Sequence, residues 1–158
     1  MRQKVFLITG FQNWGKSFII KELFNGRERF YKNKLYKLCD KKFCVQSQSN
    51  DDWGETGYIN AVNSRLKKLG SNPDYIISAF CPTKEPSNDS IRIIKNLYQN
   101  ADIYLIALEY KWCLHAQLNI NELTTYYSNI HNLQIITINE KDPKKKTKAV
   151  EQKICSLV

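Results

Sequence analysis

Eight residues near the N-terminus have the types and the spacing that bind phosphate groups. The segment Gly10-Phe11-Gln12-Asn13-Trp14-Gly15-Lys16-Ser17 matches the pattern G-x-x-x-x-G-K-[ST]. Glycines allow the backbone to bend so that successive N–H groups converge on phosphate oxygens, which a Cβ would obstruct. The sequence therefore predicts a phosphate-binding turn at residues 10–17, here named the 10–17 loop. Phe18 follows it directly.

The last residues of this loop have separate chemical roles. Lys16 is expected to place a positive charge against the β- and γ-phosphates of a nucleotide, and the Ser17 hydroxyl to ligate Mg²⁺. A helix that begins near Gly15 adds free N–H groups and the positive end of its dipole. A chain of this length contains roughly 0.005 such matches by chance. Residues 10–18 are thus the candidate nucleotide-binding residues, and Lys16 is also a catalytic candidate.

The hydrophobic pattern around the loop alternates short β-like runs with amphipathic helical stretches. Apolar runs typical of buried parallel strands occupy residues 5–9, 75–80, 103–108 and 134–138. Helical stripes are found at residues 18–24, 59–69, 91–98 and 123–130, and from Asp142 onward. Residues 29–49 predict an antiparallel hairpin with its turn at residues 39–42. This alternation predicts an α/β fold, a three-layer α/β/α sandwich with a mainly parallel central sheet, in one domain over residues 1–158.

The loop and the elements around it resemble the P-loop NTPase superfamily over the whole domain. Asn13 in the fourth position is similar to the loop of translation-factor and Ras-like GTPases, and so is the order strand, loop, helix, hairpin, D-x-x-G. Asp51-Asp52-Trp53-Gly54 matches D-x-x-G. In that family the aspartate contacts Mg²⁺ through water, and the glycine amide contacts the γ-phosphate. The resemblance therefore implies these roles for Asp51 and Gly54.

The sequence departs from the GTPase pattern in two places. Residues 18–50 contain no threonine to ligate Mg²⁺, and Ser47 and Ser49 are weak substitutes. Where the guanine-reading N-K-x-D should follow residues 103–108, the chain has Glu109-Tyr110-Lys111-Trp112. Asn139-Glu140-Lys141-Asp142 imitates the motif one strand later, but Asp142 is more simply the N-cap of the last helix. The expected substrate is therefore ATP or GTP, with adenine at least as well supported as guanine.

A phosphate loop also needs an acidic partner for its Mg²⁺. Residues 75–80 end in Cys81-Pro82 without a carboxylate, so Asp51 is the first candidate ligand and Glu109 the second. If Asp51 and Asp52 both reach the site, one holds Mg²⁺ while the other, or Glu55, orients a water or an acceptor hydroxyl. Asp51 and Asp52 therefore join Lys16 as catalytic candidates. The arginines that could stabilise transition-state charge are Arg27, Arg29, Arg65 and Arg92.

The net charge of +9 favours anionic partners. Basic residues are dense over residues 21–42 and alternate with Phe30, Tyr31 and Tyr36, which suits a nucleic acid or an acidic protein. A hairpin with one solvated face and core aromatics is the favoured interpretation. The lysines at 144–146 are expected on the exposed face of the last helix.

The chain shows no apolar run of the ~20 residues that a membrane span needs, and the short N-terminal apolar run does not predict a signal peptide. The scattered cysteines, with only two histidines, do not form a zinc pattern and predict free thiols in a reducing cytosol. A cytoplasmic protein is therefore expected. The five cysteines are Cys39, Cys44, Cys81, Cys113 and Cys155.

Three functions follow from these features. The first is Mg²⁺-dependent nucleoside triphosphate hydrolysis, as an ATPase or a GTPase-like switch. The alternative is a kinase that transfers the γ-phosphate of ATP to a small molecule or a nucleotide. The third is a nucleotide-regulated module that binds nucleic acid through residues 21–42.

Overall fold

A six-stranded sheet forms the centre of the computed structural model, which describes residues 1–111 and 116–158. The strand order is β2-β3-β4-β1-β7-β8; β2 pairs antiparallel with β3, and the other neighbours pair parallel. Trp112 and Cys113, which entered the sequence predictions, lie outside the described residues. The strands are β1 (Lys4–Thr9), β2 (Tyr36–Leu38), β3 (Lys41–Gln46), β4 (Tyr75–Phe80), β7 (Asp102–Leu108) and β8 (Leu133–Ile138).

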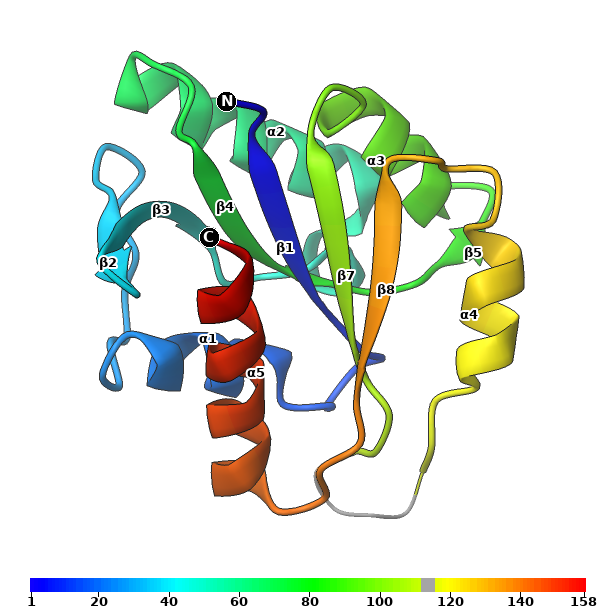
Figure 1. The fold of residues 1–158 in the computed structure, drawn as a ribbon. Helices are drawn as coiled ribbons and strands as arrows, with labels where there is room; N and C mark the ends of the chain where they lie inside the picture. Colours follow the sequence, from blue (N-terminus) through cyan, green and yellow to red (C-terminus); the bar gives the residue numbers. More distant parts are fainter. Residues whose placement is uncertain (112–115) are drawn as a thin grey trace.

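Helices cover both faces of this sheet (Figure 1). On one face α1 (Lys16–Leu23) packs against α5 (Pro143–Leu157), and on the other α2 (Asn50–Leu69) packs against α3 (Ser90–Leu97). The three-layer α/β/α prediction is therefore confirmed. Within the two described ranges, none of the helices has the length and apolar composition that crossing a bilayer requires. The remaining elements are α4 (Ile120–Tyr126) and the small antiparallel pair β5 (Lys84–Glu85) and β6 (Asn88–Asp89).

The helix α2 begins nine residues before the apolar stripe that predicted it. Asn50 starts the helix, and Asp51 and Asp52 lie in its first turn, where carboxylates interact favourably with the helix dipole. Gly54 has non-helical dihedrals (φ 70°, ψ 174°) and forms a kink within the helix. The segment that resembles D-x-x-G is therefore the start of a helix, and a periodicity search misses it because Gly54 interrupts the pattern.

The basic segment 21–42 lies beside the second half of α2. Lys32 donates to the Ser64 hydroxyl (3.2 Å), and Arg65 donates to the Phe30 carbonyl (2.9 Å). Phe30 and Tyr36 are buried in the core, whereas Tyr31 is exposed. These contacts agree with the favoured interpretation, a hairpin that buries most of its aromatics.

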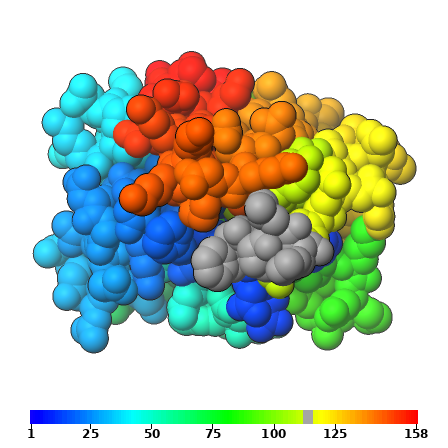
Figure 2. Space-filling model, turned by 90° about the horizontal axis from the view of Figure 1, so that it is seen from below, coloured from blue at the N-terminus to red at the C-terminus, as the bar shows by residue number. Residues whose placement is uncertain are grey.

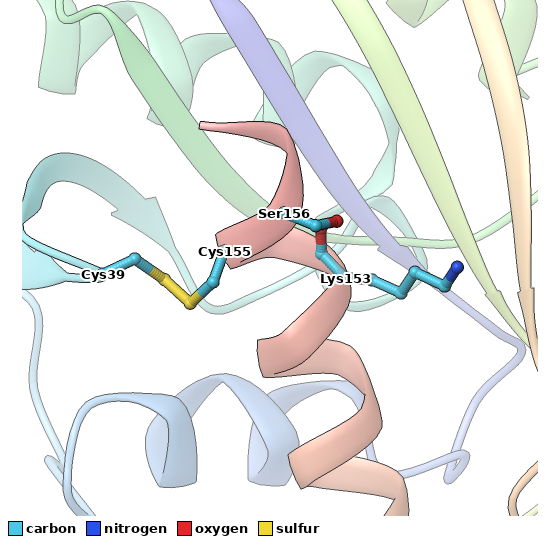
Figure 3. Close-up of a disulfide and its surroundings, with 4 residues drawn as sticks. All are labelled: Cys39, Lys153, Cys155 and Ser156. Atoms are coloured by element: carbon cyan, nitrogen blue, oxygen red, sulfur yellow. A yellow bond between two sulfur atoms is a disulfide. The ribbon is translucent and has the colours of Figure 1, made fainter.

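A disulfide between Cys39 and Cys155 corrects the prediction that these two thiols are free. Cys39 lies in the two-residue turn between β2 and β3, and Cys155 lies in the last turn of α5, with 5.4 Å between the two Cα atoms (Figure 3). The two cysteines are 116 residues apart, so no local spacing could reveal the pair. Cys44 and Cys81 are free and buried, as predicted. Disulfides persist in oxidising compartments, so the cysteines do not argue for a reducing cytosol.

Reduction of this disulfide should destabilise the fold, because the bond closes a long loop in the unfolded chain. Removal of such a cross-link costs about 2–5 kcal/mol, which corresponds to a fall in Tm of about 10 °C for a domain of this size. Thermal unfolding with and without dithiothreitol measures the effect. Cys155→Ser should show the lowered Tm without reductant and no further change with it. An unchanged Tm on reduction of the natural chain would contradict this role.

Candidate functional site

The 10–17 loop leaves the end of β1 as a tight turn. The Gly10 N–H donates to the Phe80 carbonyl of β4 (3.2 Å), and the Trp14 N–H donates to the Phe11 carbonyl (3.3 Å). A Cβ placed on Gly10 would lie 2.9 Å from the Trp14 Cβ, so this close approach requires glycine. Asn13 and Gly15 both have positive φ, 63° and 81°, a conformation that asparagine and glycine adopt more easily than other residues. The loop thus has the curvature that the sequence predicted.

The N-terminus of α1 completes a ring of backbone donors. The first N–H groups of a helix have no acceptor within the helix, and here the first N–H to bond back is that of Ile19, to the Gly15 carbonyl (2.9 Å). Among the described residues, no side chain caps this helix. The amides of Lys16, Ser17 and Phe18 are therefore available to an anion, and the helix dipole favours negative charge at the same point.

Lys16 connects the loop to the start of α2. Its Nζ donates to the Gly10 and Phe11 carbonyls (both 2.8 Å) and lies 3.3 Å from Asp51 Oδ2. The two side chains are only 7% and 15% exposed, so solvent screens this ion pair weakly. The second oxygen, Asp51 Oδ1, is buried without a hydrogen-bond partner among the described residues. A carboxylate held this way beside a lysine has one oxygen ready for a further ligand.

These residues surround a polar cavity of about 590 Å³. The structure places Asp51 and Asp52, two of the catalytic candidates, in the same cavity wall as the 10–17 loop. Lys111 also reaches this cavity, although no motif pointed to it. The described residues that line the cavity are Gln12, Asn13, Trp14, Gly15, Lys16, Ser17, Asp51, Asp52 and Lys111.

Asn50 fixes the start of α2 against the end of β4. Its Oδ1 accepts from the Cys81 N–H (2.7 Å), and its Nδ2 donates to the Cys81 carbonyl (3.0 Å). The same amide bonds to the Thr83 hydroxyl (3.0 Å) and to Asn88 Oδ1 (3.1 Å). This largely buried network occupies the strand end that lacks a carboxylate, and it places the next residue, Asp51, beside Lys16. Burial also raises the pKa of the nearby Cys81 thiol to about 12, so this thiol is neutral at pH 7.

A second, apolar cavity of about 320 Å³ adjoins the first. Trp14 and Gly15 line both cavities. Figure 2 shows the edge of the sheet at which the parallel strands end. There the N-terminal part of the chain (blue) lies beside the start of α5 (orange). The apolar cavity is lined by Trp14, Gly15, Phe18, Ile19, Pro143 and Lys146.

Several predicted residues lie outside the described wall of the polar cavity. They include Gly10, Phe11 and Phe18 from the candidate nucleotide-binding residues, and also Gly54, Glu55 and Glu109. Gly54 is at the kink of α2, and Glu109 accepts a long hydrogen bond from Gln117 (3.4 Å). Glu55 forms a two-point ion pair with Arg92 (2.6 and 2.7 Å) and accepts from the Asp89 N–H (2.7 Å). The Arg92 guanidinium lowers the pKa of the Glu55 carboxyl, so Glu55 is ionised at neutral pH and committed to this pair.

The other sequence candidates have structural partners of their own. Asp142 is the N-cap of α5 and accepts from the Lys145 N–H (3.0 Å), as its simpler interpretation predicted. Arg65 donates to Gln46 Oε1 (2.6 Å) and Arg27 lies over the Tyr36 ring. Neither arginine belongs to the described lining of the polar cavity. Among the described residues, the cations that line it are Lys16 and Lys111.

The residues of the polar cavity fit a magnesium ion. Ser17 and Asp51 lie in its wall, and Asp51 Oδ1 lacks a partner among the described residues. Mg²⁺ prefers oxygen ligands and usually takes only one or two carboxylates, completing its shell with phosphate and water. The described residues contain no cluster of three histidine, cysteine or acidic side chains.

Comparisons with known proteins do not identify a family for this chain. No protein-family model matches the chain, and no curated protein matches it. Among solved structures, shikimate kinase from Bacteroides thetaiotaomicron aligns with 10% identity and a TM-score of 0.43, over 99% of this chain and 98% of that chain. Identity and TM-score at this level carry no inference about activity.

Replacement of Asn50 tests whether its amide holds the site together. Asn50→Ala removes a fully buried group with several hydrogen bonds, so it should lower the free energy of unfolding by about 3 kcal/mol. Urea unfolding measures this loss. Gln48→Ala, an exposed side chain two residues away, is the control and should change stability by less than about 0.5 kcal/mol. A loss below about 1 kcal/mol for Asn50→Ala would mean that the network does not anchor α2.

Proposed function

We propose that this chain is a P-loop phosphotransferase, which binds a nucleoside triphosphate with Mg²⁺ and transfers the γ-phosphoryl group to the hydroxyl of a small acceptor. The observation that carries the proposal is the contact between Lys16 and Asp51 in a polar cavity walled by the 10–17 loop. One cavity thus offers backbone donors, a lysine and a carboxylate. These are the groups that phosphoryl transfer needs, because its catalysis is mainly positioning and charge stabilisation.

The two adjoining cavities suit the two parts of a nucleotide. The triphosphate would lie in the polar cavity, where the free amides of α1 and Lys16 Nζ meet its oxygens. The base would enter the apolar cavity and pack against Trp14, Phe18 and Pro143, which line it. Aromatic side chains stack on any base, since every base has a π-face. Trp14 and Gly15 line both cavities, so a nucleotide bound in this way would pass beside these two residues.

Mg²⁺ would be held by the Ser17 hydroxyl, by Asp51 and by the phosphates. When bound, the ion neutralises the charge that develops on the phosphoryl oxygens. Lys16 now bonds to two backbone carbonyls, and it would exchange these for the β- and γ-phosphate oxygens. Lys111 supplies a further positive charge on the cavity wall, the role for which the sequence offered arginines.

Two findings indicate which side chain would act on the acceptor hydroxyl. Glu55, a candidate to orient water, is committed to Arg92, and Gly54 lies outside the described cavity wall. Asp52 lies in that wall and is exposed, with only a long bond (3.3 Å) from the Ser49 N–H. Asp52 can therefore take the proton of an acceptor hydroxyl. The oxygen of that hydroxyl then forms a bond to the γ-phosphorus, and the bond from the γ-phosphorus to the β-phosphate oxygen breaks. The products are a nucleoside diphosphate and a phosphate ester.

Replacement of Lys16 is the primary test. Lys16→Ala should weaken Mg²⁺-nucleotide binding at least about tenfold, because hydrogen bonds to charged groups contribute about 1.5–3 kcal/mol each. Calorimetric titration with ATP and GTP measures the affinity, and phosphorus NMR with a panel of small hydroxyl compounds detects a new phosphate ester. Lys21→Ala, on the same helix but paired with Glu28 at the surface, is the matched control and should bind normally.

Two outcomes would overturn the phosphotransferase proposal. Equal nucleotide affinity of Lys16→Ala and the natural chain would remove the phosphate site. Rapid release of inorganic phosphate without any acceptor would instead identify water as the acceptor and make the protein a hydrolase.

Phe18 tests the position of the base separately. Its side chain is 53% exposed and lines the apolar cavity, so Phe18→Ala should preserve the fold. Loss of stacking costs about 1–3 kcal/mol, so the affinity for a nucleoside triphosphate should fall about tenfold while that for inorganic tripolyphosphate stays constant. Equal losses for both ligands in competition titrations would place the base elsewhere.

A further inference from the structure

Lys146 is a buried cation that the proposed reaction does not yet use. Its neighbours Lys144 and Lys145 are exposed, but Lys146 is only 1% exposed, contrary to the prediction for these three lysines. The helical spacing explains the difference, because Lys146 lies on the same face of α5 as the buried Val150 and Ile154. Burial lowers the pKa of the Lys146 ammonium.

The ammonium of Lys146 bonds to the segment that follows β7. Its Nζ donates to the Tyr110 carbonyl (2.8 Å), and the next residue is Lys111, which lines the polar cavity. The Lys111 N–H donates to the Ala116 carbonyl (3.0 Å), and Tyr110 forms a bridge with Gln117. Lys146 thus joins α5 to the residue directly before the cation at the cavity wall.

We infer that Lys146 is a positioning residue, which fixes the Tyr110 carbonyl and thereby places Lys111 against the phosphates of the bound nucleotide. The inference rests on the proposed function and goes beyond it, because it gives Lys146, which lines the apolar cavity, a role at the phosphates through Lys111. Burial of an ammonium is unfavourable unless it is compensated. Methionine would fill the same apolar wall without that cost, so a lysine here needs a reason, and its bond to Tyr110 supplies one.

A double-mutant cycle tests whether Lys146 acts through Lys111. Lys111→Ala should weaken Mg²⁺-ATP binding about tenfold, and Lys146→Met about fivefold. In the Lys111→Ala background, Lys146→Met should cause no further loss, since contacting or linked residues are not additive. Lys146→Arg keeps a donor and should retain more affinity than Lys146→Met. Lys145→Met, an exposed neighbour on the same helix, is the control and should bind normally.

Amide hydrogen exchange of the ligand-free protein supplies a second readout that needs no nucleotide. Lys146→Met should accelerate exchange at Lys111, whose N–H bonds to Ala116, while exchange in the central strands stays unchanged. This measurement also shows whether Lys146→Met fails to fold, because exchange would then rise throughout the chain. In that case Lys146→Arg would replace Lys146→Met in the double-mutant cycle.

Three results would overturn the inference. The first is a double variant in which the two losses of affinity add. The second is unchanged amide exchange at Lys111, and the third is normal nucleotide binding by Lys111→Ala. Each would exclude an effect of Lys146 through Lys111. They differ from failure of the proposed function, in which the natural chain and Lys16→Ala bind nucleotide equally poorly.

Discussion

The contact of Lys16 with Asp51 is the interaction on which the site depends. Lys16 belongs to the loop after β1, and Asp51 belongs to the first turn of α2, which follows β3. In the sheet, β4 lies between these two strands, so the contact spans the ends of three neighbouring strands. The ion pair is weakly exposed and shares Lys16 with two backbone carbonyls. Phosphates that replace these carbonyls would meet a cation already held in place, which is how binding sites avoid the cost of ordering.

The rest of the fold positions this contact from several directions. Parallel pairing brings the ends of β1, β3, β4 and β7 to one edge, where ligands bind in open α/β sheets. The Asn50 amide fixes the start of α2 to the end of β4, and α5 closes the apolar cavity with Pro143 and Lys146. The Cys39–Cys155 disulfide holds the far end of α5 to the β2–β3 turn. Residues from all parts of the chain thus position the site at the edge of the sheet.

The features that the sequence predicted correctly were local ones. The 10–17 loop could be read from eight adjacent residues, and the parallel strands from short apolar runs. Lys146 had a usable signal, because its spacing from Val150 and Ile154 places it on the buried face of α5. Its charge, however, favoured the prediction that the side chain is exposed to solvent. Lys111 carried no local signal, since its place at the cavity depends on the segment after β7. No motif pointed to Asn50, because its partners lie more than 30 residues away. Long-range pairs of this kind emerge only from the folded structure.

The most direct test of the phosphate site is a crystal structure with Mg²⁺ and a non-hydrolysable nucleoside triphosphate. The account predicts that the β- and γ-phosphates lie within the 10–17 loop, that Lys16 Nζ leaves the Gly10 and Phe11 carbonyls for phosphate oxygens, and that Asp51 faces the ion. A nucleotide bound elsewhere, or a loop that stays empty with Lys16 still bonded to those carbonyls, would contradict it.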